Sequence, residues 1–212
     1  MKKERGFEEK VAGIILAAGS SSRMGQAKQL LPLHGIPLVA CVVKEALNSR
    51  LDHVFLVLGH MAESVREALG DLISNPRLSV LFNPDYQEGM SSSIRTGIRQ
   101  AGDDFAHAMI ILGDMPFISG RIIDDLIVNY IASARPLGAL LVGGLRSHPV
   151  ILSRVFYPDL LKLGGDKGAR DLFALHEKVT FLFEPAAPFD PGDIDTPSDY
   201  EYAQRKTLSP RS

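Results

Sequence analysis

Short apolar runs alternate with amphipathic helical patterns along most of this chain of 212 residues. Residues 13–18 (GIILAA) have the continuous apolar character of a strand buried on both faces, whereas residues 37–49 repeat apolar side chains at the spacing of one helix face. The same alternation predicts further strands at 53–59, 78–83 and 108–114 and further helices at 62–69, 91–101 and 119–134. Such alternation is typical of βαβ units, so the sequence predicts an α/β fold with a mainly parallel central sheet and helices on both faces.

The second half of the chain is less regular. Two short strands are expected at 138–144 and 148–153, joined as a hairpin through 145–147, and a helix at 166–178 precedes a strand at 179–184. We expect the serines at 91–93 and Ser119 to cap their helices, and Thr196, Pro197 and Asp199 to begin a final helix with a capping box. No repeat or linker is visible, so we expect a single domain over 11–206, an N-terminal extension at 1–10 and a frayed tail at 207–212.

Charge and cysteine content exclude several classes of function. The formal net charge is only -2, which favours neither a nucleic-acid nor a membrane partner. Cys41 is the single cysteine and lies in the apolar stripe of a helix, so we interpret it as a core residue rather than a nucleophile. The apolar stretch at 11–19 is too short for a membrane span and does not fit a secretory signal, so we expect a cytoplasmic protein.

The loop after the first strand (LAAGSSSRMGQAK, 16–28) has the composition of an anion site. Ala17, Ala18 and Gly19 are small enough for a ligand to approach the backbone, whose consecutive N–H groups can bind an anion. Arg23 and Lys28 add two cations, which suit a polyphosphate better than a single carboxylate. The alternative is a surface loop with two solvated cations, and neither GxGxxG nor GxxxxGK[ST] is present.

Several candidate ligands follow other predicted strands. Ligands of open α/β sheets bind beyond the carboxyl ends of the strands, which here brings Gly59, Asn83 and Asp114 into consideration. Asp114 could bind Mg²⁺ carried by a nucleotide, and Asp193 and Asp195, two apart in an extended segment, could add carboxylates. The alternatives are that Asp114 is a turn residue and that the other two aspartates cap the final helix, although Thr196 already suits that role.

These residues together resemble one family. The stretch 16–38 (LAAGSSSRMGQAKQLLPLHGIPL) matches, without a gap, the signature LAAGxSxRMGxxKxLLPLxGxPL of the MobA-like NTP transferases. The segments NPDYQEGMSSS, GDMP, HPV, GDKGAR and DIDTP follow in the family's order, so that the resemblance covers about residues 11–204. It implies the Rossmann-like three-layer nucleotidyltransferase fold, which is of the glycosyltransferase A type.

The resemblance also implies roles for individual residues. Lys28, Arg23 and Asp114 would be catalytic, with Mg²⁺ bound by Asp114 and Asp195 and with Asp193 as a further candidate ligand. His148 and Asp166 would lie where the acceptor approaches, although His148 before Pro149 is equally consistent with a structural role. The implied nucleotide-binding residues are Leu16, Ala17, Ala18, Gly19, Arg23, Lys28, Gly59, Asn83, Gly89, Ser93 and Asp114.

Within the family, the sequence is most similar to the molybdenum cofactor cytidylyltransferases. The implied reaction transfers CMP from CTP to the phosphate of molybdenum-bound molybdopterin and releases pyrophosphate. Related guanylyltransferases have a second glycine in place of Ala18 and NVNTP in place of DIDTP, which favours cytidine here. An acceptor phosphate needs no general base, consistent with the absence of an obvious Ser/His/Asp or Cys/His set in the sequence.

Two alternatives stay open at the level of sequence. One is a nucleotidyltransferase of the same fold that uses GTP or a sugar or polyol phosphate acceptor. The other is a non-catalytic molybdenum cofactor carrier, which would not need carboxylates beside a triphosphate loop. Whether the protein is the cytidylyltransferase or the carrier, its partner would be an apo-molybdoenzyme of the xanthine oxidase type. The docking segment would be 156–163 or 173–178.

Overall fold

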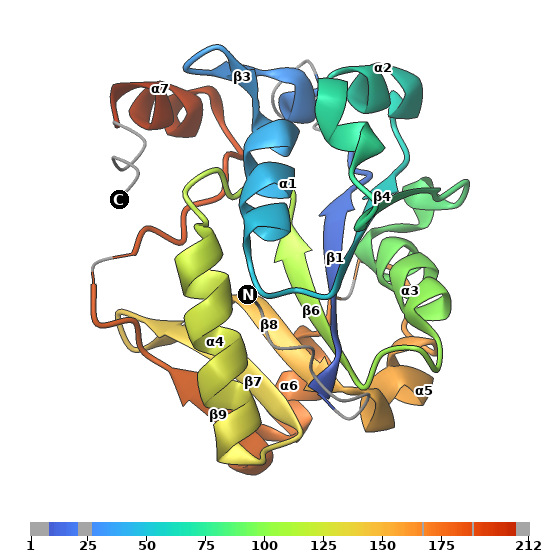
Figure 1. Cartoon of the computed structure of the whole chain (residues 1–212), viewed down its shortest axis with the longest axis vertical. Coiled ribbons are helices and arrows are strands. Elements are labelled where there is room, and N and C mark those ends of the chain that lie inside the picture. The colour runs from blue at the N-terminus through green and yellow to red at the C-terminus, as the bar shows by residue number, and fades with distance from the viewer. Residues whose placement is uncertain (1–8, 21–26, 167, 188, 207–212) are drawn as a thin grey trace.

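A central β-sheet organises the molecule. The computed structural model describes residues 9–20, 27–166, 168–187 and 189–206, and within them the sheet has seven strands in the order β5-β4-β1-β6-β8-β7-β9 (Figure 1). Strands β5, β4, β1 and β6 are parallel neighbours, β8 runs antiparallel between β6 and β7, and β9 pairs parallel with β7. The strands are β1 (Val11–Ala17), β4 (His53–Leu58), β5 (Leu78–Phe82), β6 (His107–Leu112), β7 (Leu137–Val142), β8 (Leu145–Ser153) and β9 (Thr180–Phe183).

Helices cover both faces of this sheet. One face packs against α1, α2 and α4, and the other against α3, α5 and α6 (Figure 1). Strand β1 contributes side chains to both layers. Val11 and Ile15 pack in the apolar cluster with α1, α2 and α4, and Ala12 and Ile14 pack in the cluster with α3, α5 and α6. The predicted three-layer α/β fold is therefore confirmed. The helices are α1 (Leu38–Asn48), α2 (Ala62–Glu67), α3 (Met90–Ala101), α4 (Gly120–Ser133), α5 (Tyr157–Leu160), α6 (Arg170–Leu175) and α7 (Pro197–Arg205).

The carboxyl ends of the parallel strands meet at one edge of the sheet and are joined by backbone hydrogen bonds. The N–H of Gly113 donates to Leu16 O at 2.9 Å, and the N–H of Asn83 donates to Leu58 O at 2.8 Å. The N–H of Ile194 donates to Asp114 O at 3.1 Å, which attaches the C-terminal segment to the end of β6. The loops that follow β1, β4, β5 and β6 therefore lie together with residues from near the end of the chain.

Two of the predicted helix caps are confirmed. The Ser119 side chain accepts a hydrogen bond from the N–H of Ile122 at the start of α4. Thr196 and Asp199 form a capping box at the start of α7, with Pro197 at its first position. Cys41 is buried in α1, as the interpretation of a core residue required.

The prediction for the start of α3 was wrong. Its N-cap is Gly89, with a φ of 100°, and Ser91, Ser92 and Ser93 lie inside the helix with buried side chains. The reason is tertiary: Asn83 donates to the hydroxyl groups of Ser92 and Ser93 and so draws these serines inward. Local propensity favoured the cap, but the long-range contact decided the position.

The second half differs from the prediction in three places. The turn between β7 and β8 is Gly143–Gly144, both with positive φ, so residues 145–147 belong to β8 instead of the turn. Helix α6 begins at Arg170 and ends at Leu175, followed by a 3-10 turn at Glu177–Val179, and is shorter than the predicted 166–178. Helix α5 was not predicted. In the first half of the chain, the small hairpin of β2 (Pro32–Leu33) and β3 (Ile36–Pro37) was not predicted either.

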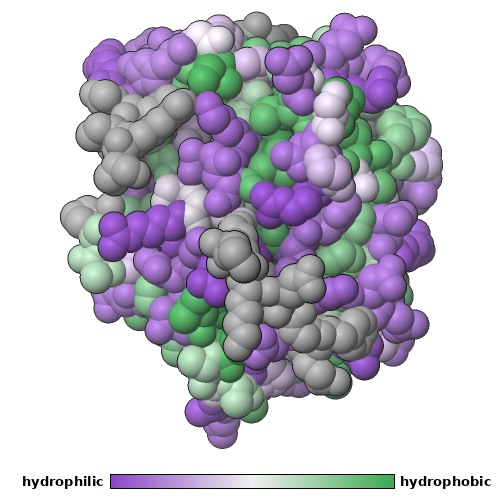
Figure 2. Space-filling model, in the orientation of Figure 1, coloured by the Kyte–Doolittle hydropathy of each residue, from purple (hydrophilic) through white to green (hydrophobic). Residues whose placement is uncertain are grey.

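Hydrophilic and apolar residues are interspersed over the face seen in Figure 2. Among the helices that the structure describes, none is both long enough and apolar enough to cross a bilayer. The expected tail at 207–212 and most of the expected extension at 1–10 lie outside the described residues.

Candidate active site

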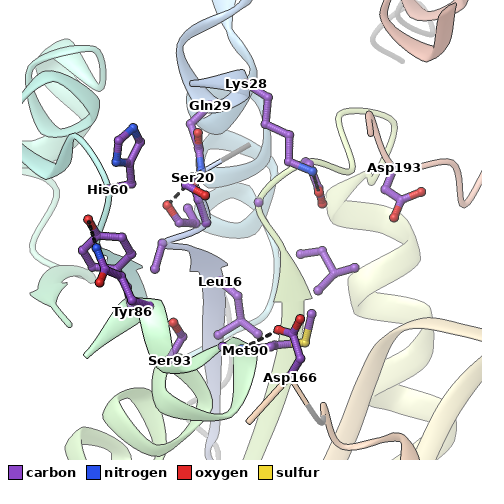
Figure 3. A pocket seen from close by; sticks show the side chains of 18 of the residues that line it. Leu16, Ser20, Lys28, Gln29, His60, Tyr86, Met90, Ser93, Asp166 and Asp193 are labelled. Carbon is purple, nitrogen blue, oxygen red and sulfur yellow. Dashed lines mark hydrogen bonds and ion pairs between the residues drawn. The ribbon is translucent and has the colours of Figure 1, made fainter. Parts of the chain in front are cut away.

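A cavity of about 920 Å³ opens at the carboxyl edge of the parallel strands (Figure 3). The ends of β1 and β6, the 3-10 turn Lys28–Leu30 and the loop at 86–90 form its walls, together with Asp193 and Asp195. His60 and Tyr86 stand on one side, with ring centroids 6.2 Å apart, and Asp193 lies on the opposite side (Figure 3). The predicted site residues that line it are Leu16, Ala17, Ala18, Gly19, Lys28, Gly89, Ser93, Asp114, Asp166 and Asp195.

The floor of the cavity is the backbone that follows β1. Ala17 and Ala18 are almost fully buried, so their small side chains leave the peptide groups as the surface that a ligand meets. Gln29 holds this backbone in place, because its amide Nε2 donates to Ala17 O at 3.3 Å and to Gly19 O at 2.7 Å. Gln29 is itself buried, which protects both hydrogen bonds from competition with water.

Lys28 stands between two carboxylates at the rim of this floor. Its Nζ lies 2.5 Å from Asp114 Oδ2 and 2.7 Å from Asp195 Oδ1, and its side chain is only 15% exposed. Burial by itself lowers the pKa of Lys28, but the attraction of Asp114 and Asp195 outweighs it and holds the pKa above its ordinary value. Lys28 therefore carries a positive charge in the cavity.

Asp193 completes a cluster of three carboxylates. One ligand oxygen from each of Asp114, Asp193 and Asp195 lies within 4.8 Å of the others. Partial burial raises the pKa of Asp193, and the negative charges of Asp114 and Asp195 add to that shift, although Lys28 opposes it. Counted over the described residues alone, three carboxylates with one ammonium among them leave an excess of negative charge.

The cluster fits a divalent cation. Oδ1 of Asp114 is buried and accepts no hydrogen bond from the residues that the structure describes. A buried carboxylate oxygen without a donor is costly unless a cation or water satisfies it, and Mg²⁺ prefers such oxygen ligands. Asp114 and Asp195, with Asp193 beside them, are thus the residues that could hold Mg²⁺.

The start of α3 forms the opposite wall. A Cβ on Gly89 would lie 2.7 Å from the carbonyl of Gly165, so this close approach requires glycine. Asp166 Oδ1 accepts a hydrogen bond from the N–H of Met90 at 3.3 Å, as the dashed line in Figure 3 marks. Ser93 faces the cavity and is held by Asn83, whose Nδ2 lies 3.0 Å from the hydroxyl oxygen.

Two of the predicted nucleotide contacts do not line the cavity, and a third lies in a part of the chain that the structure does not describe. Asn83 is buried and does not line the cavity; it positions Ser92 and Ser93 instead. Gly59 lies behind the cavity wall, where a Cβ would be 2.5 Å from the Cβ of Tyr86. Arg23 lies outside the described residues.

His148 is also absent from the cavity lining. It precedes Pro149 in β8, and its Nδ1 is buried without a hydrogen-bond partner among the described residues. Burial lowers the pKa of His148 and outweighs a backbone hydrogen bond at Ile110 and the negative charge of Asp193, which raise it, while Arg146 and Arg170 lower it slightly further. These surroundings favour a neutral imidazole packed beside the site.

Sequence reasoning overlooked several residues of the cavity. Gln29 is a buried polar residue directly before the apolar Leu30 and Leu31, and that position could have marked it. His60 comes two residues after β4, at the carboxyl edge of the sheet, and this position could have predicted a contact with a ligand in the cavity. Tyr86 reaches the cavity through the 3-10 turn Tyr86–Glu88, for which the sequence carries no clear signal.

Together, the fold and this edge define an α/β protein of the nucleotidyltransferase class, with a backbone floor for phosphates beside a lysine and a carboxylate cluster. The chain matches the MobA-like NTP transferase domain over residues 13–179 and belongs to that family. The resemblance seen in the sequence motifs is therefore confirmed.

Three relatives align over nearly the whole chain. The purine catabolism protein PucB of Bacillus subtilis (strain 168) is 32% identical, over 91% of this chain and 95% of that protein. The molybdenum cofactor cytidylyltransferase of Escherichia coli (strain K12) is 28% identical over the same shares. The nicotine blue oxidoreductase of Paenarthrobacter nicotinovorans is 29% identical, over 88% of this chain and 92% of that protein.

Solved structures share the fold. A homologue of Mycobacterium tuberculosis Rv0371c from Mycobacterium sp. strain JC1 superposes with a TM-score of 0.80 at 28% identity, covering 92% of this chain and 95% of that one. Rv0371C of M. tuberculosis H37Rv, in complex with manganese, has a TM-score of 0.77 at 23% identity, covering 93% of this chain and 100% of that one.

Proposed function

We propose that this protein transfers CMP from CTP to the phosphate of molybdenum-bound molybdopterin, forming the cytosine dinucleotide cofactor and releasing pyrophosphate. The observation that carries the proposal is the position of Lys28 between Asp114 and Asp195, beside the backbone floor of Ala17–Gly19. The relationship to the E. coli cytidylyltransferase supports this choice of substrates, as do Ala18 and the DIDTP segment.

The reaction needs positioning and charge neutralisation more than proton transfer. An acceptor phosphate oxygen forms a bond to the α-phosphorus of CTP, while the bond from that phosphorus to the bridging oxygen of the β-phosphate breaks. The oxygen is already anionic, so no base is required. Lys28 stabilises the charge that grows on the departing pyrophosphate, and Arg23 contributes to the same stabilisation.

The carboxylate cluster supports use of a divalent cation. Asp114 and Asp195 would hold Mg²⁺, with Asp193 as a third candidate. When bound there, the ion supplies neutralisation of the triphosphate charge and fixes the orientation of its oxygens. The manganese complex of the similarly folded Rv0371C agrees with a divalent ion in this fold.

The acceptor would approach from the side of Asp166. Asp166 lies at the lower edge of the cavity, beside Met90 and away from Lys28 (Figure 3). His148, packed beside the site, is proposed to support this wall by shape. Delivery to an apo-molybdoenzyme of the xanthine oxidase type would use the surface of segments 156–163 and 173–178, where Leu161 and Leu175 are exposed.

The test is pyrophosphate release by the purified protein with Mg²⁺ and molybdenum cofactor, comparing CTP, GTP, ATP and UTP. We expect release to be fastest with CTP, to require the cofactor, and to be lost in Asp114→Asn. A preference for GTP would overturn the assignment of cytidine but keep the transfer reaction. Absence of release with every nucleotide, from protein shown to be folded, would contradict the proposal and favour a different acceptor or a carrier.

A further inference from the structure

We propose that Lys28 is the internal counter-ion of the metal-free protein: its ammonium occupies the space between Asp114 and Asp195 and competes with the divalent cation for their oxygens. Nucleotide phosphates on the adjacent floor then draw Lys28 away, so that metal and nucleotide bind as a unit. This second step rests on the proposed function, whereas the competition for the carboxylates does not.

The distances leave little room for both cations. The Nζ of Lys28 is within 2.7 Å of an oxygen of Asp114 and of Asp195, which is full contact for a charge-assisted hydrogen bond. Lys28 contacts Oδ2 of Asp114, so a Mg²⁺ or Mn²⁺ ion bound through the neighbouring Oδ1 and through Asp195 would stand close to a like charge. The partial burial of Lys28 and Asp114 weakens solvent screening, so the repulsion would be strong.

The Lys28 side chain can also reach a second position, beside the backbone floor at Ala17–Gly19. Its backbone is fixed in the 3-10 turn Lys28–Leu30, while its four-carbon side chain has several rotatable bonds. The next residue, Gln29, is bonded to Ala17 O and Gly19 O, so the turn lies directly against the phosphate floor. Rotation of the side chain alone can therefore move the ammonium from the carboxylates toward phosphates bound on that floor.

The competition predicts opposite effects of Lys28 on two properties of the nucleotide-free protein. Removing the ammonium takes away a positive charge that Asp114 and Asp195 share, so the repulsion between the carboxylates grows and stability falls. The same removal takes a like charge away from the position of a metal ion, which raises metal affinity. A lysine that served only to bind phosphate, or only to fill space, would not produce the second effect.

The experiment is a calorimetric titration of Mn²⁺ into the full chain without nucleotide. Lys28→Met removes the charge and keeps most of the aliphatic volume, and Lys162→Met is the matched control, because Lys162 is exposed and pairs only at 4.0 Å with Asp159. We expect Lys28→Met to bind Mn²⁺ about tenfold more tightly than the natural protein, and Lys162→Met to be unchanged. Equal, weaker or undetectable binding by Lys28→Met overturns the proposal.

Two further measurements guard against a folding defect. The melting temperature of Lys28→Met should fall without metal and recover at saturating Mn²⁺, a pattern that Lys162→Met should not show. Lys28→Gln is a second neutral variant with the same expectation, whereas Lys28→Arg keeps the charge and should bind Mn²⁺ no better than the natural protein. Tight Mn²⁺ binding by Lys28→Arg, equal to that of Lys28→Met, would contradict competition by charge.

These outcomes are independent of the reaction catalysed. All the titrations are done without nucleotide or acceptor, so a protein that fails to use CTP can still show the competition. Conversely, the protein could use CTP while Lys28→Met binds Mn²⁺ no more tightly than the natural protein. That result would support the proposed function and overturn the competition between Lys28 and the metal.

Discussion

The side-chain amide of Gln29 lies 2.7 Å from the carbonyl oxygen of Gly19 and thereby fixes the loop that leaves β1. A second hydrogen bond to Ala17 O ties the same amide to the last residue of the strand. Both carbonyl oxygens therefore accept a hydrogen bond from Gln29. The N–H groups of this segment are left as the groups that a phosphate can meet.

We therefore predict that Gln29→Leu weakens nucleotide binding. The variant keeps a similar volume but loses both donors, which should raise the nucleotide KM about tenfold and lower stability by about 1–3 kcal/mol. Steady-state kinetics and urea denaturation would measure the two effects. Gln100→Leu, at an exposed position of α3, is the control, and a Gln29→Leu enzyme with an unchanged nucleotide KM would show that the loop holds its shape without Gln29.

Asp114→Asn should nearly abolish turnover and leave the fold intact. The variant keeps the shape of the side chain but removes the charge that contacts Lys28, and it weakens the carboxylate cluster. We expect kcat to fall by about 10²–10³-fold or more, with a circular dichroism spectrum like that of the natural protein. Asp125→Asn, on the outer part of α4, removes the same charge far from the cluster and should keep full activity. An active Asp114→Asn enzyme would remove Asp114 from the reaction.

The sequence predicted the layers of the fold because hydrophobic periodicity reports burial directly. Residues 13–18 and 37–49 had the patterns of a buried strand and an amphipathic helix, and the structure has β1 and α1 there. The β7–β8 turn was misplaced, because a pair of glycines at its centre extends the apolar run of 138–144 instead of interrupting it in an obvious way. Periodicity cannot tell where a hairpin turns when its turn residues are small.

The site was predictable where residues follow strands and not where they depend on long-range packing. Asp114 and Lys28 belong to segments whose position the sheet order fixes, and they do meet in the structure. Asn83 was expected to touch the nucleotide, but its side chain turns inward to the serines of α3. A sequence shows that a polar residue is near a strand end, but the direction of its side chain depends on which partner the folded chain brings closest.

Gly97→Ala should destabilise the protein. Gly97 lies in α3 against β1, and a Cβ there would overlap Cγ2 of Ile14. Alanine favours a helix by about 1 kcal/mol over glycine, but overpacking of a buried contact costs more, so we expect a net loss of about 1–2 kcal/mol. Urea denaturation measures this loss, and Gly164→Ala, which meets nothing within 4 Å, should leave stability close to that of the natural protein. Equal stability of the two variants would show that α3 can move away from β1.

His53 should make the protein less stable in mild acid. Burial lowers the pKa of His53, the charge of Arg77 lowers it further, and its Nε2 lies 2.9 Å from the Ser79 hydroxyl oxygen. Because this pKa is lower in the folded than in the unfolded protein, the unfolded state binds more protons. The stabilisation is complete above the unfolded pKa of about 6.5 and is lost as the pH falls below it.

The measurement is the free energy of unfolding in urea from about pH 7.5 to about pH 5.5. His53→Gln can keep a hydrogen bond to Ser79 but does not titrate, so its stability should decline less over this range than that of the natural protein. Comparison of the two proteins cancels the contribution of His148, whose pKa is also lowered by burial. Parallel pH profiles would mean that His53 is protonated in the folded state at no cost.

Arg95 joins the two segments that form the acceptor side of the cavity, and its loss should affect the acceptor more than the nucleotide. Its guanidinium lies 2.8 Å from Glu88 Oε2 and 2.5 Å from Leu163 O, and so connects the loop before α3 to the segment that leads to Asp166. Arg95→Met should loosen this wall and raise the acceptor KM about tenfold, with less than about a twofold change in the nucleotide KM.

Arg99→Met is the matched control, because Arg99 lies one turn further along α3 at an exposed position. It removes the same charge and should change neither KM, so any effect confined to Arg95→Met comes from its contacts. A purely stabilising role for Arg95 would lower the melting temperature without separating the two KM values. Because Glu88 and Asp166 both line the cavity while Arg95 holds their segments from behind, we expect the separation to be observed.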